Sequence, residues 1–261
     1  MAAPRDRLGT KSPAPSSRPA EAHDKARGRA LKPKDAATLV LVDRSGREPR
    51  ILLGRRQSTQ VFLPDKYVFP GGRVDRGDRT MPALTELTAS DQDLLLRDMK
   101  GTPSAARIRA LGLAAVRETF EEAGLIVGAR PTDERSNAHA APARPPTQES
   151  WQRFLATGFM PSLSGLSFLA RAITPPARPR RYDTRFFMAD ASLVVHRTSS
   201  CDDELCDLDW FTLEQIRNLD VPNITRAIVE DIAQRLATPD GNVAIPYYRY
   251  ERGAFRRDLI A

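Results

Sequence analysis

Cysteine is scarce in this sequence, because Cys201 and Cys206 are the only two among 261 residues. Two cysteines in a chain this long do not make the disulfide framework of a small secreted protein. No histidine or further cysteine stands close to them, which argues against a zinc site. Both cysteines are expected to be ordinary residues.

Long apolar runs are also absent. No uninterrupted apolar segment approaches the roughly 20 residues that a membrane-spanning helix needs. The N-terminus lacks the apolar stretch of a secretory signal. We therefore expect a cytoplasmic protein that makes no use of a membrane.

The formal net charge is +7, and most of it lies in residues 1–34. These residues carry nine Lys or Arg and three acids, so the rest of the chain is nearly neutral. They are rich in Pro, Ala, Ser and Arg, and their few apolar groups cannot offset the entropy of ordering. We predict a disordered basic tail over 1–34, and no nucleic-acid binding by the folded part.

The rest of the chain interleaves strand and helix patterns. Apolar, β-branched runs predict strands at 36–44, 51–56, 67–74, 166–173 and 184–190, and 192–197 either continues the last of these or pairs with it. Helices are predicted at 91–99, 104–123, 151–156 and 224–237, and 207–219 is predicted to be a strand that enters a helix. This order predicts an α/β domain with a mixed sheet over 35–255. Residues 128–148 are a low-complexity stretch predicted to be a mobile loop, and the basic, aromatic segment 246–260 is either a lid or a packed edge.

The helix at 104–123 carries the chemistry. On a helical wheel Glu118, Glu121 and Glu122 fall within an arc of roughly 100°, and the apolar residues lie on the opposite face. Like charges at these spacings destabilise a helix by a few tenths of a kcal/mol per pair. They suit a hard divalent ion such as Mg²⁺, which takes oxygen ligands and shares them with phosphates. The alternative is a solvated acidic face with Arg117 as its partner.

A Gly-Gly turn precedes this helix in the segment FPGGRVD (69–75). Such a turn lets main-chain groups approach a ligand without interference from a Cβ. Together, Gly72 and the run RETFEEAGL (117–125) resemble the signature of the Nudix hydrolases. Two departures stand out: Asp78 occupies a place that is usually Glu, and 38 residues separate it from Arg117 where the family usually has seven. We interpret the extra residues, about 79–112, as an excursion of the connecting loop, which costs little closure entropy.

An insertion at this place resembles the branch of peroxisomal coenzyme A diphosphatases and their bacterial relatives. The segments LLGRR (52–56), YVFPGGRVD (67–75), ITPPARPRRYDTRFF (173–187) and DLDWFTLEQI (207–216) are similar to that branch as well. The resemblance implies the Nudix fold, with a mixed sheet sandwiched between helices in an α/β/α arrangement. It also implies Mg²⁺-dependent, or Mn²⁺-dependent, hydrolysis of a phosphoanhydride bond in a nucleoside diphosphate linked to another moiety. Coenzyme A or an acyl-CoA is the favoured substrate.

The resemblance also implies roles for individual residues. The metal ligands would be Glu118, Glu121, Glu122 and the carbonyl of Gly71, with Glu121 or Glu122 as the general base. Glu204 is the candidate for a further catalytic acid from a distant loop, and Arg56 and Arg181 are the candidates for substrate binding. Arg117, Gly72 and Gly124 would support the site, with Arg117 orienting the carboxylates.

Two other interpretations stay open from sequence alone. The first changes the substrate to ADP-ribose, a dinucleotide or a nucleotide sugar. The second is a regulator that binds a nucleotide without cutting it, although such a protein would be expected to lose metal carboxylates. In each case the partner is a small nucleoside-diphosphate derivative, and a homodimer is compatible with the sequence.

Overall fold

The computed structural model describes residues 31–97, 99–131, 146–199, 204–238 and 244–260. The predicted tail therefore lies almost wholly outside the described residues, although its last residue, Lys34, already belongs to the first strand. Most of the loop predicted at 128–148 also lies outside them.

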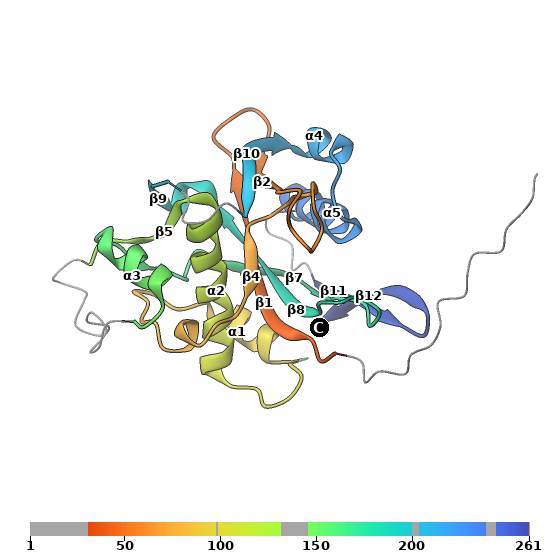
Figure 1. The fold of residues 1–261 in the computed structure, drawn as a ribbon, viewed down its shortest axis with the longest axis horizontal. Helices are drawn as coiled ribbons and strands as arrows, with labels where there is room; N and C mark the ends of the chain where they lie inside the picture. The colour runs from red at the N-terminus through yellow and green to blue at the C-terminus, as the bar shows by residue number, and fades with distance from the viewer. Residues whose placement is uncertain (1–30, 98, 132–145, 200–203, 239–243, 261) are drawn as a thin grey trace, which may run out of the picture. The chain divides into compact units, whose positions relative to one another are not determined.

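Within the described residues, nine strands form one mixed sheet (Figure 1). Seven follow one another across it: β10 (Leu205–Thr212), β2 (Arg50–Arg56), β1 (Lys34–Asp43), β8 (Tyr182–Asp190), β7 (Ser167–Ile173), β11 (Ile245–Glu251) and β12 (Ala254–Ile260). Two short strands, β3 (Tyr67–Val68) and β4 (Gly71–Arg73), pair with β2 and β1. β1 runs parallel to β8 and antiparallel to β2, so the sheet is mixed as predicted.

Helices cover both faces of this sheet. Alternate side chains of the central strand β1 point to opposite faces, and its apolar run is buried on both sides. Leu39 and Leu41 pack in the core beneath α2 (Ala105–Ala123), whereas Val40 and Val42 pack with α4 (Leu213–Asn218) and α5 (Asn223–Ala237). The predicted α/β/α layering is confirmed.

The ends of α2 follow the expected capping rules. The Ser104 hydroxyl accepts a hydrogen bond from the Arg107 N–H at the start of the helix. At its end Gly124 adopts φ 66°, in the left-handed region, and a Cβ there would collide with the carbonyl of Thr198. Glycine is required at this stop for both reasons.

A second, three-stranded sheet lies beside α2 and contains β6 (Met160–Pro161), β5 (Leu125–Ala129) and β9 (Val194–Arg197). The prediction that 192–197 continues or pairs with the strand at 184–190 was wrong. A 3₁₀ turn at Ala191–Leu193 redirects the chain, and β9 pairs antiparallel with β5 instead. The expected loop at 128–148 also begins too early, because Gly128 and Ala129 belong to β5.

The predicted excursion at 79–112 is well packed where it is described. It contains α1 (Ala89–Leu96), and its last residues form the first turns of α2. Its apolar side chains enter the core on the α2 side of the sheet: Met81, Ala83, Leu87, Leu95 and Met99 are all buried. Asp91 on α1 also accepts a hydrogen bond from the Phe168 N–H at an irregularity in β7.

The C-terminal strands β11 and β12 form an antiparallel hairpin at one margin of the main sheet. Tyr247 and Tyr248 are buried, while Phe255 and Leu259 are more than half exposed. The hairpin therefore corresponds to the packed edge rather than to a separate lid. None of the helices in the described part of the chain combines the length and apolar character needed to cross a membrane.

Candidate functional site

The Gly-Gly turn and the acidic helix lie against each other. Strand β4, which contains Gly71 and Gly72, pairs with β1 and faces α2. The Gly71 N–H donates a hydrogen bond to Glu122 Oε2 at 2.9 Å. A Cβ on Gly72 would stand 2.5 Å from the carboxylate of Glu118, so only glycine permits this approach. Two of the three predicted glutamate ligands, Glu118 and Glu122, thus lie against Gly71 and Gly72.

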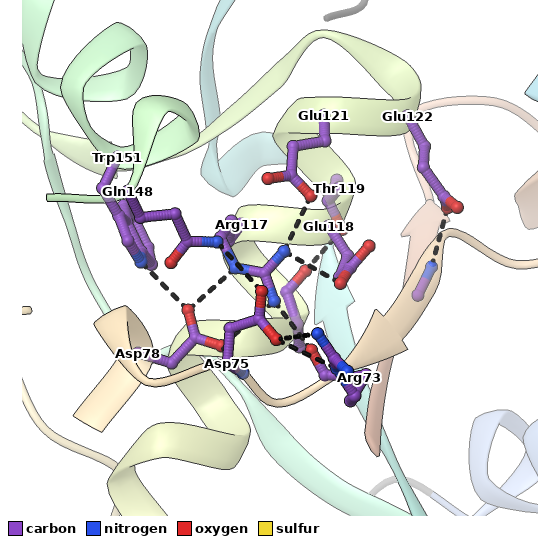
Figure 2. Close-up of polar contacts among 12 residues, drawn as sticks. Arg73, Asp75, Asp78, Arg117, Glu118, Thr119, Glu121, Glu122, Gln148 and Trp151 are labelled. Carbon is purple, nitrogen blue, oxygen red and sulfur yellow. Dashed lines mark hydrogen bonds and ion pairs between the residues drawn. The ribbon is translucent and has the colours of Figure 1, made fainter. Parts of the chain in front are cut away.

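Arg117 lies at the centre of the hydrogen-bond network of the site (Figure 2). Its Nη1 donates to Glu118 Oε1 at 2.9 Å and to Glu121 Oε2 at 2.7 Å. Its Nε and Nη2 donate to the two oxygens of Asp78 at 2.8 and 3.0 Å, and Nη2 also reaches the Arg73 carbonyl at 2.8 Å. All five N–H groups of the guanidinium are used. The predicted role of Arg117 in orienting the carboxylates agrees with this geometry.

Asp78 holds the guanidinium of Arg117 in place. Its carboxylate is fully buried and, besides Arg117, accepts the indole N–H of Trp151 at 2.9 Å and the Asp75 N–H at 2.7 Å. Trp151 is itself fully buried on α3 (Glu149–Ala156). The acid after the turn, whose role the sequence left open, therefore has every oxygen occupied by donors. Sequence reasoning missed Trp151, since nothing in linear spacing joins two residues 73 positions apart.

The charges at this site do not balance. Asp78, Glu118, Glu121 and Glu122 bring four carboxylates to one corner, and Arg117 is the guanidinium that binds three of them. Burial, together with the neighbouring charge of Glu121, raises the pKa of Glu118 to about 8, although Arg117 opposes that rise. Burial also acts to lower the pKa of Arg117, but its hydrogen bond to Asp78 and the surrounding carboxylates raise it above its usual value.

Excess carboxylate oxygen at a partly buried site is the donor chemistry that hard divalent cations take. The residues present therefore fit such an ion in charge and in ligand type. Among the described residues, however, no three acidic, histidine or cysteine side chains already converge on one point as a metal cage. Glu118 and Glu121 are turned toward Arg117, and Glu122 toward Gly71.

The other predicted site residues lie on neighbouring strands. Glu204, just before β10, forms an ion pair with Arg56 at the end of β2, and Gln60 accepts a further hydrogen bond from Arg56. The structure thus brings together a predicted catalytic acid and a predicted substrate-binding residue. The Glu204 side chain is 37% exposed, whereas that of Arg56 is 11% exposed.

Arg181 stands apart from this pair, at the start of β8. It donates to the carbonyls of Thr174 at 3.0 Å and Leu31 at 2.7 Å. Its position next to β7 and β11 places it beside a cavity rather than beside the glutamates of α2.

No protein-family model matches this chain. It is 29% identical over 206 residues to the acyl-coenzyme A diphosphatase NUDT19 of Gallus gallus, which covers 61% of this chain and 53% of that protein. It is 26% identical over 187 residues to the putative nudix hydrolase 7 of Caenorhabditis elegans, which covers 68% of this chain and 50% of that protein. The chain thus spans about half the length of these two curated relatives.

Among solved structures, the chain resembles a NUDIX hydrolase from Alicyclobacillus acidocaldarius. The TM-score is 0.54 at 25% sequence identity, over 76% of this chain and 90% of that one. The shared fold includes the mixed sheet with helices on both faces, which is the arrangement that brings the Gly-Gly turn against α2.

Proposed function

We propose that this chain, which is similar to Nudix hydrolases in sequence and fold, hydrolyses a phosphoanhydride bond in a nucleoside diphosphate linked to another moiety. One observation carries the proposal. Arg117 gathers Glu118 and Glu121 on one face of α2, and the Gly71–Gly72 turn receives Glu118 and Glu122 on the same side. The hydrolase domain, predicted over 35–255, would extend to Lys34 and Ile260, where the first and last strands of the main sheet begin and end.

In this proposal Glu118, Glu121 and Glu122 hold Mg²⁺ or Mn²⁺, with the Gly71 carbonyl as a further ligand. The bound ion would neutralise charge that develops on the diphosphate oxygens. The residues of the chain do the rest of the work. Arg117 holds the carboxylates of Glu118 and Glu121, and Asp78 holds Arg117 in place.

A carboxylate of the cluster must accept the proton of the attacking water. Glu121 and Glu122 are the two candidates, and they differ in accessibility. The Glu121 side chain is 13% exposed, whereas Glu122 is 1% exposed and hydrogen-bonded to the turn. We therefore favour Glu121 as the base and Glu122 as the ligand tied to the turn. Glu204 and Arg56 would act from the neighbouring strands β10 and β2, where their ion pair keeps both near the sheet.

Coenzyme A or an acyl-CoA is the substrate that we favour. The support is the similarity to a protein named as an acyl-coenzyme A diphosphatase, together with an insertion between Asp78 and Arg117. The pantetheine arm would leave as a phosphorylated product, and the nucleotide half would leave as the other.

A hydrolysis panel tests the proposal. The full chain is incubated with Mg²⁺ and with coenzyme A, acyl-CoA, ADP-ribose, NADH, diadenosine polyphosphates or nucleotide sugars, and the products are read by mass. We expect release of 3′,5′-ADP and phosphopantetheine, lost in Glu121→Gln and retained in the control Glu214→Gln, which neutralises an exposed glutamate on α4. Cleavage of another diphosphate would discard the coenzyme A assignment. No cleavage of any member by folded, metal-loaded protein would overturn the hydrolase.

A further inference from the structure

A cavity of about 180 Å³ lies at the opposite end of α2 from the glutamates. Three parts of the chain line it: Lys100 near the end of the insertion, the connection between β7 and β8, and strand β11. The lining residues besides Lys100 are Ile173, Thr174, Arg181, Tyr247, Arg249, Tyr250 and Glu251. A cavity of roughly 150 Å³ can hold a benzene ring, so there is room here for a phosphate group or a small ring. The insertion that sets this chain apart thus supplies one wall.

The lining carries a surplus of positive charge. Lys100, Arg181 and Arg249 face it together with one carboxylate, that of Glu251. Arg249 is paired with Asp258 at 2.7 Å and with Glu251 at 3.4 Å. Arg181 donates hydrogen bonds to two main-chain carbonyls. Neither Arg181 nor Lys100 forms an ion pair with another residue in the described ranges. Within the described residues, two of the three cations therefore have no carboxylate partner.

A buried cluster of arginines and aspartates lies next to the cavity. Asp35 binds Arg107 through both oxygens at 2.6 and 2.8 Å, and Asp183 binds Arg171 at 2.8 and 2.7 Å. Arg185 lies between the two aspartates at 3.3 and 3.1 Å. Nη2 of Arg185 is buried without a hydrogen-bond partner among the described residues.

The cluster is joined to the cavity directly. Arg171 lies over the ring of Tyr247 at 4.5 Å, and that ring is part of the cavity lining. Arg107 also donates a hydrogen bond to the Lys100 carbonyl at 2.6 Å, and this bond holds the main chain of a residue that lines the cavity. Tyr250 contributes a ring that is 44% exposed, a surface suited to a planar group.

We propose that this cavity is a second ligand site, distinct from the carboxylate corner, and that it binds a phosphorylated small molecule. Arginine and lysine together suit a phosphate, since the guanidinium offers paired donors and the ammonium a point charge. The site is separate from the first because Arg107 and Glu118 are eleven residues apart on α2, about 16 Å along the helix axis.

The test uses the full chain in EDTA at low salt. Without a metal the carboxylate corner repels phosphates, so binding then reports on the basic cavity whether or not the chain is a hydrolase. Inorganic phosphate and AMP are each titrated and followed by calorimetry and by amide shifts. We expect saturable binding that Lys100→Glu weakens by about tenfold or more. The control Arg97→Glu reverses the same charge at an exposed position of the insertion outside the cavity lining and should change the affinity by less than about twofold.

Two results would overturn the proposal: no saturable binding of either probe to the unaltered chain, or equal weakening by the two charge reversals. Circular dichroism of both variants checks that they remain folded. Tyr250→Ala separates the sources of affinity, since a nucleotide that uses the ring should bind this variant more weakly while inorganic phosphate should not. If Tyr250→Ala leaves both affinities unchanged while Lys100→Glu lowers them, the phosphate group alone is recognised and the proposal stands.

Discussion

Ionic clusters lie near both ends of α2, one built mainly from carboxylates and the other mainly from guanidinium groups. Near its C-terminal end Arg117 pairs with Asp78, Glu118 and Glu121, and Glu122 accepts a hydrogen bond from the nearby Gly71 N–H. Near its N-terminal end Arg107, Arg171 and Arg185 share Asp35 and Asp183. Burying a charge is costly unless it is paired, and each end pairs its buried charges mainly with groups from other elements. The comparison teaches that one end of the helix is suited to a cation and the other to an anion.

The largest effect should come from removing a charge at the acidic end. Glu118→Gln takes away a proposed metal ligand, and metal ions supply several kcal/mol of transition-state stabilisation, so hydrolysis should fall by at least about 10²-fold. Stability in EDTA should stay the same or rise, because burial and Glu121 already oppose a charge at this position. Steady-state kinetics and thermal melts with and without Mg²⁺ measure both. A variant that loses stability in EDTA yet keeps its activity would contradict the comparison.

The opposite response is expected at the basic end. Asp183→Asn removes the carboxylate shared by Arg171 and Arg185, which are both buried. Breaking a buried pair by removing one partner costs about 3–5 kcal/mol. Urea unfolding should show this loss equally with and without Mg²⁺. Asp209→Asn, at an exposed position of β10, is the control. A loss that Mg²⁺ reverses would mean that the two ends are not independent.

A smaller effect should follow from Trp151→Phe, which keeps a ring in place but removes the indole donor to Asp78. Asp78 retains its bonds to Arg117 and Asp75, so the cost to folding should be about 1–2 kcal/mol. Residues that hydrogen-bond to metal ligands change metal affinity by about 10–100-fold. Trp151 acts on the proposed ligands only through Asp78 and Arg117, so we expect a loss of Mn²⁺ affinity of about tenfold. Mn²⁺ titration of this variant beside Trp210→Phe, on β10, gives the comparison. The idea fails if both variants bind Mn²⁺ as the unaltered chain does.

The smallest effect concerns acid. Burial acts to raise the pKa of Asp35, but its hydrogen bond to Arg107 and the charges of Arg185 and Arg107 outweigh burial and lower it below 3.8. A lowered carboxyl pKa gives stability that is fully present above the unfolded value and is lost as pH falls through the folded value. The stability difference between the unaltered chain and Asp35→Asn should therefore be constant above pH 5 and shrink toward pH 3. Urea midpoints across that range would refute it by showing a difference that grows on acidification.

Much of the acidic end could be predicted from the sequence. The spacing of Glu118, Glu121 and Glu122, the stop at Gly124 and the Gly-Gly turn are local patterns, and local patterns survive folding. The orientation of the helix against the sheet followed from its apolar face. The contact between Asp78 and Trp151 did not, because the two residues are far apart in sequence and meet only in the folded chain.

The basic end was largely hidden from the sequence. Arg181 was singled out as a phosphate contact, but its neighbours Lys100 and Arg249 come from segments that linear reasoning kept separate. Arg171, Asp183 and Asp35 lie on three strands whose order depends on the parallel pairing of β1 with β8. Strand β9 shows the same limit of sequence analysis. Its apolar run predicted a strand, but its pairing with β5 depends on the turn at Ala191–Leu193 and appears only in the folded chain.

The insertion between Asp78 and Arg117 has a practical consequence for redesign of this chain. Shortening it to the usual seven residues would save little loop entropy, yet it would delete Met81, Leu87 and Leu95 from the protein interior. It would also remove Glu86, which holds Arg109 at 2.8 Å, and Lys100, which closes the second cavity. We therefore expect a shortened chain to misfold or aggregate.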